Sequence, residues 1–151
     1  MASSSYCGRT DVEIEHGATN VSAWADLDGD QDATKIAARI ESAIEDACEE
    51  VENRLRGGVH EVPLPFSSRE ITNIAAVLAG CALYAKRGAE DTEDGKDRLQ
   101  VKRERAYARL ASIRTGDIVL DNPAAAVGVP AAVRDHHHHH HHAHSGWSDV
   151  T

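Results

Sequence analysis

Apolar residues recur at three- and four-residue steps along most of the chain between Tyr6 and Asp121, a spacing that is typical of amphipathic helices. Short segments containing glycine, proline or acidic residues separate the periodic stretches, as expected where helices end and begin. The stretches comprise a short helix, a long helix, an alanine-rich helix and a second long helix. The sequence therefore predicts an all-α domain of four helices, followed by an extended C-terminal tail.

The first two helices are predicted at residues 10–17 and 34–56. Thr10 caps the first helix and Gly17 ends it, and residues 18–25 are expected to form a loop. The second helix is apolar on one face. Its opposite face is either ordinary solvated surface or the lining of a passage for a polyanion, where like charge prevents sticking. That face carries four regularly spaced glutamates: Glu41, Glu45, Glu49 and Glu52.

The third helix is the most apolar part of the chain. Ser67 and Glu70 form a capping box at its start, and Gly88 ends it. No charged residue lies between Glu70 and Lys86. A helix that is apolar nearly all round is buried against several neighbours, within the subunit or between subunits. This helix offers more apolar surface than a small monomer needs, so self-association would add useful burial.

The fourth helix follows an acidic loop at residues 90–94, with Thr92 as its cap, and Gly116 closes it. A short extended apolar run comes next. We expect this run to pair with another strand or to dock on a partner protein, and it consists of Ile118, Val119 and Leu120.

From Asn122 the composition changes, and we divide the chain into a helical domain, residues 1–121, and a low-complexity tail, residues 122–151. The tail contains seven consecutive histidines, which suggest a purification tag, a metal-binding tract or a natural segment. Further residues follow the run, so we interpret it as natural or as an unusual engineered segment. It has no catalytic geometry.

Asp26, Asp28 and Asp30 match the first three ligand positions of a calcium loop, because hard cations prefer carboxylates at alternate positions. The rest of the motif is missing, with Gln31 in place of the glycine and Ala37 in place of the bidentate glutamate. The alternative is an Asx-rich turn whose acids cap the next helix and complement its dipole. We favour this alternative and predict no metal site.

The net charge of −9 argues against a sequence-independent grip on nucleic acid. Basic residues cluster between Lys96 and Arg109, but acids interleave with them, which favours a solvated helix face over a DNA site. No signal peptide or membrane-spanning stretch is evident. The three cysteines form no CxxC pair and favour a reducing compartment without a disulfide framework.

Catalytic chemistry needs a nucleophile beside a base, or a cluster of metal ligands. His16 and His60 have no evident partners at a useful spacing. We therefore expect no enzymatic activity, no catalytic residue and no cofactor.

The order and spacing of these elements resemble the phage head–tail connector proteins, also called adaptor or head-completion proteins, and are most similar to the Mu-like prophage group. The resemblance covers Tyr6 to Asp121. It is carried by Tyr6 with the short Thr10–Gly17 helix, the Asp26–Asp32 loop, the Thr34–Arg56 helix ending in Glu52-Asn53-Arg54-Leu55, the Val62-Pro63-Leu64-Pro65 segment, the alanine-rich helix ending near Tyr84, and Arg105-Ala106-Tyr107 through Gly116.

The resemblance implies an all-α virion subunit that assembles, in the host bacterial cytoplasm, into a ring that is commonly dodecameric. Such a ring lies beneath the portal protein in the head–tail neck and extends the DNA channel. Genomic DNA passes through it without specific binding, and it offers a platform for the next neck or tail-terminator protein. No chemistry and no membrane are involved.

On this interpretation, residues 118–120 dock on the portal or on an adjacent connector. The acidic face of the second helix, or the acidic loop at 90–94, faces the channel. The alternatives are a non-viral intracellular helical interaction protein, a calcium-responsive helical module based on residues 26–32, and a small DNA-binding protein based on residues 96–109.

Overall fold

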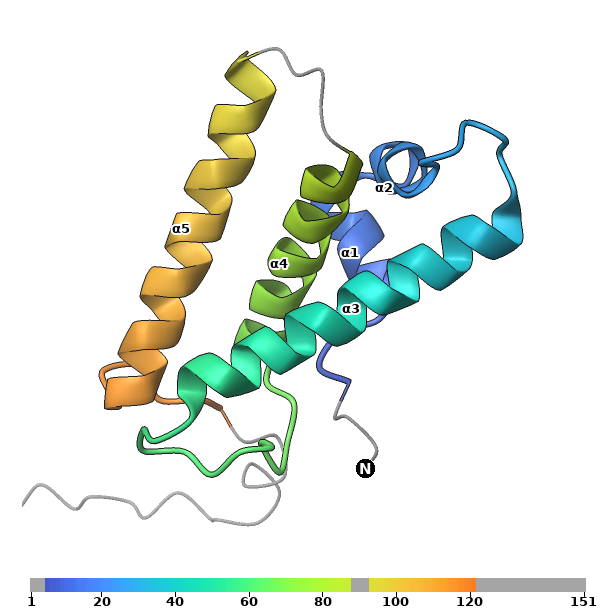
Figure 1. The fold of residues 1–151 in the computed structure, drawn as a ribbon. Helices are drawn as coiled ribbons and strands as arrows, with labels where there is room; N and C mark the ends of the chain where they lie inside the picture. Colours follow the sequence, from blue (N-terminus) through green and yellow to red (C-terminus); the bar gives the residue numbers. More distant parts are fainter. Residues whose placement is uncertain (1–4, 88–92, 122–151) are drawn as a thin grey trace, which may run out of the picture.

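A computed structural model describes residues 5–87 and 93–121 of the chain. Within these ranges the protein contains five helices and no strand, so the all-α prediction is confirmed and the predicted number of helices is wrong. The tail at 122–151, with its histidine run, and the predicted cap Thr92 lie outside the described residues. The helices, shown in Figure 1, are α1 (Arg9–His16), α2 (Ala18–Ala25), α3 (Ala33–Leu55), α4 (Arg69–Arg87) and α5 (Glu93–Thr115).

The helix that the sequence analysis missed is α2, at residues predicted to form a loop. Gly17 has a φ of 87° and separates α1 from α2, because glycine adopts this conformation without a steric cost. Val21 and Ala25 are fully buried on the inner face of α2. Three apolar positions, Val21, Trp24 and Ala25, fit one face of a helix in this segment, and little more than one turn is too short for a period to be recognised.

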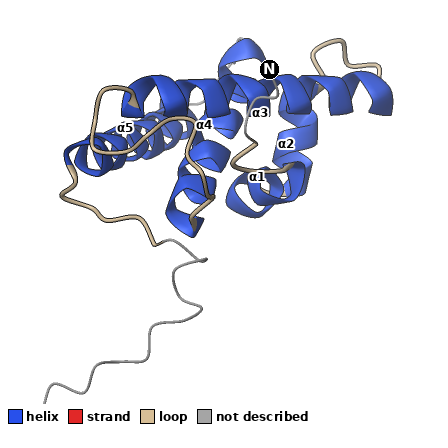
Figure 2. Cartoon of the chain, turned by 90° about the horizontal axis from the view of Figure 1, so that it is seen from below, coloured by secondary structure: helices blue, strands red, loops and turns tan. Residues whose placement is uncertain are grey.

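The alanine-rich helix α4 is the centre of the domain and contacts each of the other four helices. Figure 1 shows α3 crossing in front of α4 and α5 running alongside α4, and Figure 2 shows the helices from below. Four helices of the same chain therefore cover the apolar surface of α4. The inference that this surface exceeds the need of one subunit is wrong. Its buried residues are Ile71, Ile74, Ala75, Ala76, Leu78, Ala79, Gly80, Cys81 and Leu83.

The start of α4 differs from the predicted capping box. The hydroxyl of Ser68, not that of Ser67, accepts a hydrogen bond from the backbone N–H of Ile71, at 3.2 Å. Ser67 instead donates to the carbonyl oxygen of Tyr6, at 3.3 Å, and Glu70 forms an ion pair with Arg109 of α5. Ser67 thus bonds to the N-terminal segment and Glu70 bonds to α5, so neither side chain forms the predicted capping box.

Asp32 caps α3, where its carboxylate accepts hydrogen bonds from the backbone N–H groups of Thr34 and Lys35. At the other end of α3, Gly58 packs so closely on α5 that an added β-carbon would lie 2.5 Å from the carbonyl oxygen of Arg114. Gly116 ends α5 as predicted, with a φ of 85°. No helix within the described ranges is both long enough and apolar enough to cross a membrane.

Candidate interaction surfaces

The loop between α2 and α3 holds its aspartates in ion pairs and caps. Lys35 Nζ lies 2.5 Å from Asp30 Oδ2 and 3.4 Å from Asp28 Oδ2, and Arg39 Nη2 lies 2.8 Å from Asp28 Oδ2. Asp30 also accepts a hydrogen bond from the backbone N–H of Asp32, which completes an Asx-type turn. The loop therefore forms a capping turn before α3, and the absence of a metal site there stays a prediction.

These contacts also set the ionisation of the loop. The hydrogen bond from Arg39 lowers the pKa of Asp28, and that from Lys35 lowers the pKa of Asp30. The third member of the predicted calcium set, Asp26, has a buried Oδ1 without a hydrogen-bond partner among the described residues. Within that part of the chain, no three acidic, histidine or cysteine side chains are arranged to hold a metal ion.

The four glutamates that the sequence analysis singled out lie in one line on the solvent side of α3, and we call them the acidic stripe: Glu41, Glu45, Glu49 and Glu52. The first three are exposed and form no ion pair or hydrogen bond with another described residue. Glu52 is half-buried and accepts a hydrogen bond from the hydroxyl of Tyr6, at 3.0 Å. Whether the stripe faces a DNA channel remains a prediction.

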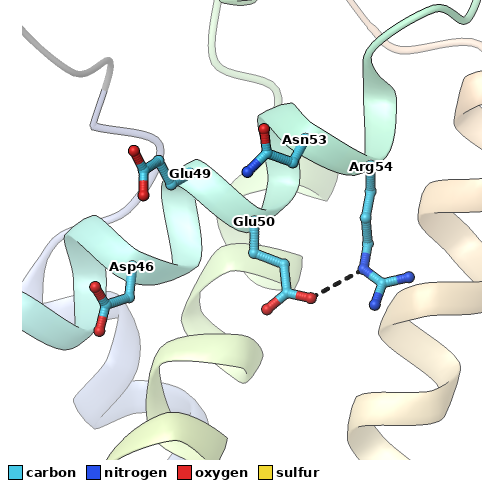
Figure 3. Close-up of a pocket in the computed structure, with 5 residues that line it drawn as sticks. All are labelled: Asp46, Glu49, Glu50, Asn53 and Arg54. Carbon is cyan, nitrogen blue, oxygen red and sulfur yellow. Dashed lines mark hydrogen bonds and ion pairs between the residues drawn. The ribbon is translucent and has the colours of Figure 1, made fainter.

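An open hollow of about 410 Å³ borders the acidic stripe on α3. Figure 3 shows Glu50 directed towards Arg54, and the two side chains form an ion pair at 3.0 Å. The guanidinium of Arg54 in turn lies 3.5 Å from the ring centre of Tyr107 on α5, a cation–π contact. This edge of α3 is therefore occupied by contacts within the subunit, unlike the exposed acids of the stripe.

Four basic residues form a second line, on α5, which the sequence analysis did not separate from the surrounding charges. We call them the basic stripe: Arg98, Lys102, Arg105 and Arg109. Lys102 pairs with Glu15 of α1 at 2.7 Å, and Arg109 pairs with Glu70 of α4. Arg98 and Arg105 are exposed and have no partner among the described residues. Steps of four, three and four residues were the signal that could have revealed this line.

A hollow of about 410 Å³ lies beside the basic stripe, between α4 and α5. Lys102, Arg105 and Arg109 line one side of it, and Asn73 and Val77 of α4 line another. Ile14, the neighbour of Glu15 on α1, is 79% exposed. Ile14 lines a different hollow, with Thr72 and Ala76 of α4, so the surface beside the basic stripe is mainly positive in charge.

The C-terminal run divides into anchored and free residues. Leu120 is buried in the core of the same subunit, and Ile118 is partly buried against that core. The backbone N–H of Ile118 donates to the carbonyl oxygen of Ser112, at 3.1 Å. Val119, which points away, is 80% exposed. The structure therefore leaves Val119 as the residue of this run that a partner could reach, and docking itself remains a prediction.

The N-terminal segment joins three parts of the fold through Tyr6 and Cys7. The Tyr6 hydroxyl accepts from the backbone N–H of Leu64 at 3.0 Å, while its carbonyl oxygen accepts from Thr72 at 2.9 Å. The thiol of Cys7 forms a hydrogen bond with the thiol of Cys48 on α3. This hydrogen bond is the main cause that raises the pKa of Cys7, and burial is the second. All three cysteines are buried and free. The sequence offered no sign that Cys7 and Cys48 meet.

The described part of the chain is thus all-helical, with two oppositely charged stripes and an exposed valine, Val119, after the last helix. The sequence model of the family described as Bacteriophage Mu, Gp36 matches residues 6–136, which include the whole helical domain and continue beyond Asp121. The chain belongs to this family and is a phage protein. Comparisons with curated proteins and with solved structures find no match.

Proposed function

We propose that this phage protein is a structural subunit of the virion, a head–tail connector that forms a ring between the portal and the tail or neck. The observation that carries the proposal is the family match over residues 6–136. It agrees with the resemblance of residues 6–121 to the connector proteins, which rests on the order and spacing of their elements. The proposed assembly takes place in the host cytoplasm, and the ring extends the DNA channel without catalysing a reaction.

The charge of the chain supports this role. A channel that conducts DNA must not bind it tightly, and a net charge of −9 opposes tight binding of a polyanion. The sequence predicts two channel-facing elements, and the acidic stripe on α3 is the first of them. The acidic loop at 90–94, the other predicted channel-facing element, lies outside the side chains that the structure describes.

Val119 is the proposed contact with the portal or with the next neck protein. It is 80% exposed while its neighbour Leu120 is buried, so the fold holds an apolar side chain in solvent at a fixed place. Truncation after Gly116 would remove Leu120 from the core and would disturb folding as well as docking. A substitution at Val119 avoids this ambiguity.

Deletion of the gene from the phage that encodes this chain tests the proposal. We expect DNA-filled heads without attached tails, and expression of the intact protein in trans should restore complete virions. The Val119→Asp variant should fold and fail to restore them. Leu27→Asp, at an exposed apolar position in the α2–α3 loop, is the matched control and should restore them.

Two results would reject the proposed function. Infectious, tailed particles that form without the protein would exclude a connector. A deletion that leaves heads empty of DNA, with no complementation defect in Val119→Asp, would indicate a role before DNA packaging instead.

A further inference from the structure

The acidic stripe on α3 and the basic stripe on α5 have the same length and opposite charge. The outer residues of each stripe lie eleven positions apart, from Glu41 to Glu52 and from Arg98 to Arg109. At about 1.5 Å per residue, each stripe covers roughly 16 Å of helix. Steps of three and four residues place the side chains in a row along the helix surface. Each stripe is therefore a straight row of like charges.

The two rows do not neutralise each other within one subunit. No ion pair between described residues joins the acidic stripe to the basic stripe. The basic stripe finds its internal partners on α1 and α4, and the acidic stripe finds one in Tyr6. Within the two stripes, five charges have no hydrogen bond or ion pair with another described residue: Glu41, Glu45, Glu49, Arg98 and Arg105.

We propose that the stripes form the contact between neighbouring copies of this chain, with the acidic stripe of one subunit lying along the basic stripe of the next. The inference rests on the proposed function in one respect, because a ring requires that each subunit use two different surfaces. A contact of this heterologous kind leaves one stripe free at each end of a chain of subunits, and it closes into a ring where the rotation permits.

A second copy matches the basic stripe better than DNA does. Lys and Arg side chains bind duplex DNA by neutralising phosphates, but Glu15 and Glu70 already lie against this stripe and reduce its charge. The net charge of −9 adds a general repulsion of polyanions. An acidic row of equal length is available on every other copy.

The proposal places the acidic stripe between subunits and not on the wall of the channel. The two placements predict opposite effects of charge reversal. Carboxylates on a channel wall do not hold subunits together, so reversing them would leave assembly intact. Carboxylates in the contact are required for it.

Charge reversal in the full-length chain tests the contact. One variant carries Glu45→Arg with Glu49→Arg, and the other carries Arg98→Glu with Arg105→Glu. Sedimentation velocity at low salt, up to about 1 mM protein, should show the wild type as oligomers that salt weakens. Each variant alone should associate at least about tenfold more weakly, because reversing two of the four charges leaves that stripe with no net charge. In an equimolar mixture, the intact acidic stripe of one variant can meet the intact basic stripe of the other, so the mixture should form pairs that neither variant forms alone.

Matched controls reverse charges of the same sign at other exposed positions. Glu61→Arg in the α3–α4 loop and Arg103→Glu on another face of α5 should leave association unchanged. Far-ultraviolet circular dichroism checks that each variant is folded. If a reversal variant does not fold, the neutral pair Glu45→Gln with Glu49→Gln replaces it and should weaken association less strongly.

Three outcomes would overturn the contact. They are a wild type that remains monomeric at low salt, reversed variants that associate normally, and a mixture that does not recover association. Loss of duplex binding in the Arg98→Glu, Arg105→Glu variant with unchanged association would assign the basic stripe to DNA instead. Each of these results leaves the gene-deletion phenotype untouched, so the contact can fail while the proposed function stands.

Discussion

The imidazole ring of His16 lies directly against Gly80, so closely that a β-carbon at position 80 would be 2.2 Å from both Cδ2 and Nε2 of the ring. The absence of a side chain at Gly80 lets α1 approach the middle of α4. Trp24 of α2 packs edge-on against His16, with ring centroids 5.5 Å apart, and against Tyr84, at 5.2 Å. The three rings therefore tie α1, α2 and α4 together around one glycine.

Gly80→Ala should destabilise the protein. Alanine in a helix interior is favoured over glycine by about 1 kcal/mol, whereas overpacking a core costs about 1–3 kcal/mol. Because Trp24 holds the His16 ring in place, we expect the steric cost to exceed the gain. Urea denaturation gives the difference in unfolding free energy. The His16→Ala, Gly80→Ala double variant is the control and should be more stable than His16→Ala alone. A Gly80→Ala protein more stable than the wild type would contradict the close packing.

The stability of the protein should fall in mild acid because of His16. Burial lowers the pKa of this histidine and Lys102 adds to the effect, while Glu15 opposes it. The unfolded chain, with a pKa of 6.5 for this group, therefore binds a proton more readily than the folded protein does. Well above pH 6.5, His16 is neutral in both states and does not reduce the stability of the fold. As the pH falls below 6.5, protonation of His16 in the unfolded chain progressively favours unfolding.

Urea denaturation between about pH 8 and pH 5 measures this effect, since the slope of stability with pH reports the difference in bound protons. The wild type should lose more unfolding free energy over this range than His16→Gln, which cannot titrate at position 16. Equal losses in the two proteins would show that His16 is not held neutral in the fold.

Tyr6→Phe should detach the N-terminal segment from the loop before α4. The Tyr6 hydroxyl donates to Glu52 and accepts from the buried backbone N–H of Leu64. An N–H group left buried without a partner costs about 1–3 kcal/mol. We expect a loss of that order in urea denaturation. Glu52→Gln, which keeps an acceptor for the hydroxyl, should be closer to the wild type, and a neutral Tyr6→Phe change would argue against this hydrogen-bond network.

Calcium should not stabilise the protein. Asp28 and Asp30 are engaged by Lys35 and Arg39, and a calcium ion would have to displace these cations before it could bind. The melting temperature should be the same with calcium and with a chelator. The Lys35→Ala variant is the informative comparison, because it frees Asp30. A rise in melting temperature with calcium in the wild type would revive the calcium-loop interpretation.

Long periodic segments were predictable from the sequence, and short ones were not. The predicted helix at 34–56 matches α3 to within one residue at each end, because seven buried residues repeat along it. The apolar face of α2 consists of Val21, Trp24 and Ala25 and spans little more than one turn, so no period can be recognised there. A hydroxyl three residues before Glu70 fits a capping box, so the sequence predicts Ser67 as the cap of α4. The Ser67 hydroxyl instead donates to the carbonyl oxygen of Tyr6, which is far away in sequence, and Ser68 caps α4.

The candidate surfaces show the same limit. The glutamates of α3 could be placed on one face from their spacing, since spacing fixes position on a helix. The division of the C-terminal run into a buried Leu120 and an exposed Val119 depends on where α5 lies against the core, which no local pattern contains. The contact of Cys7 with Cys48 likewise depends on the path of the N-terminal segment.

Electron-microscopic reconstruction of the neck in intact virions tests the central claim most directly. The account predicts a closed ring of this five-helix domain directly beneath the portal, with α3 of each copy lying along α5 of the next. A neck whose density contains no such domain would contradict the account.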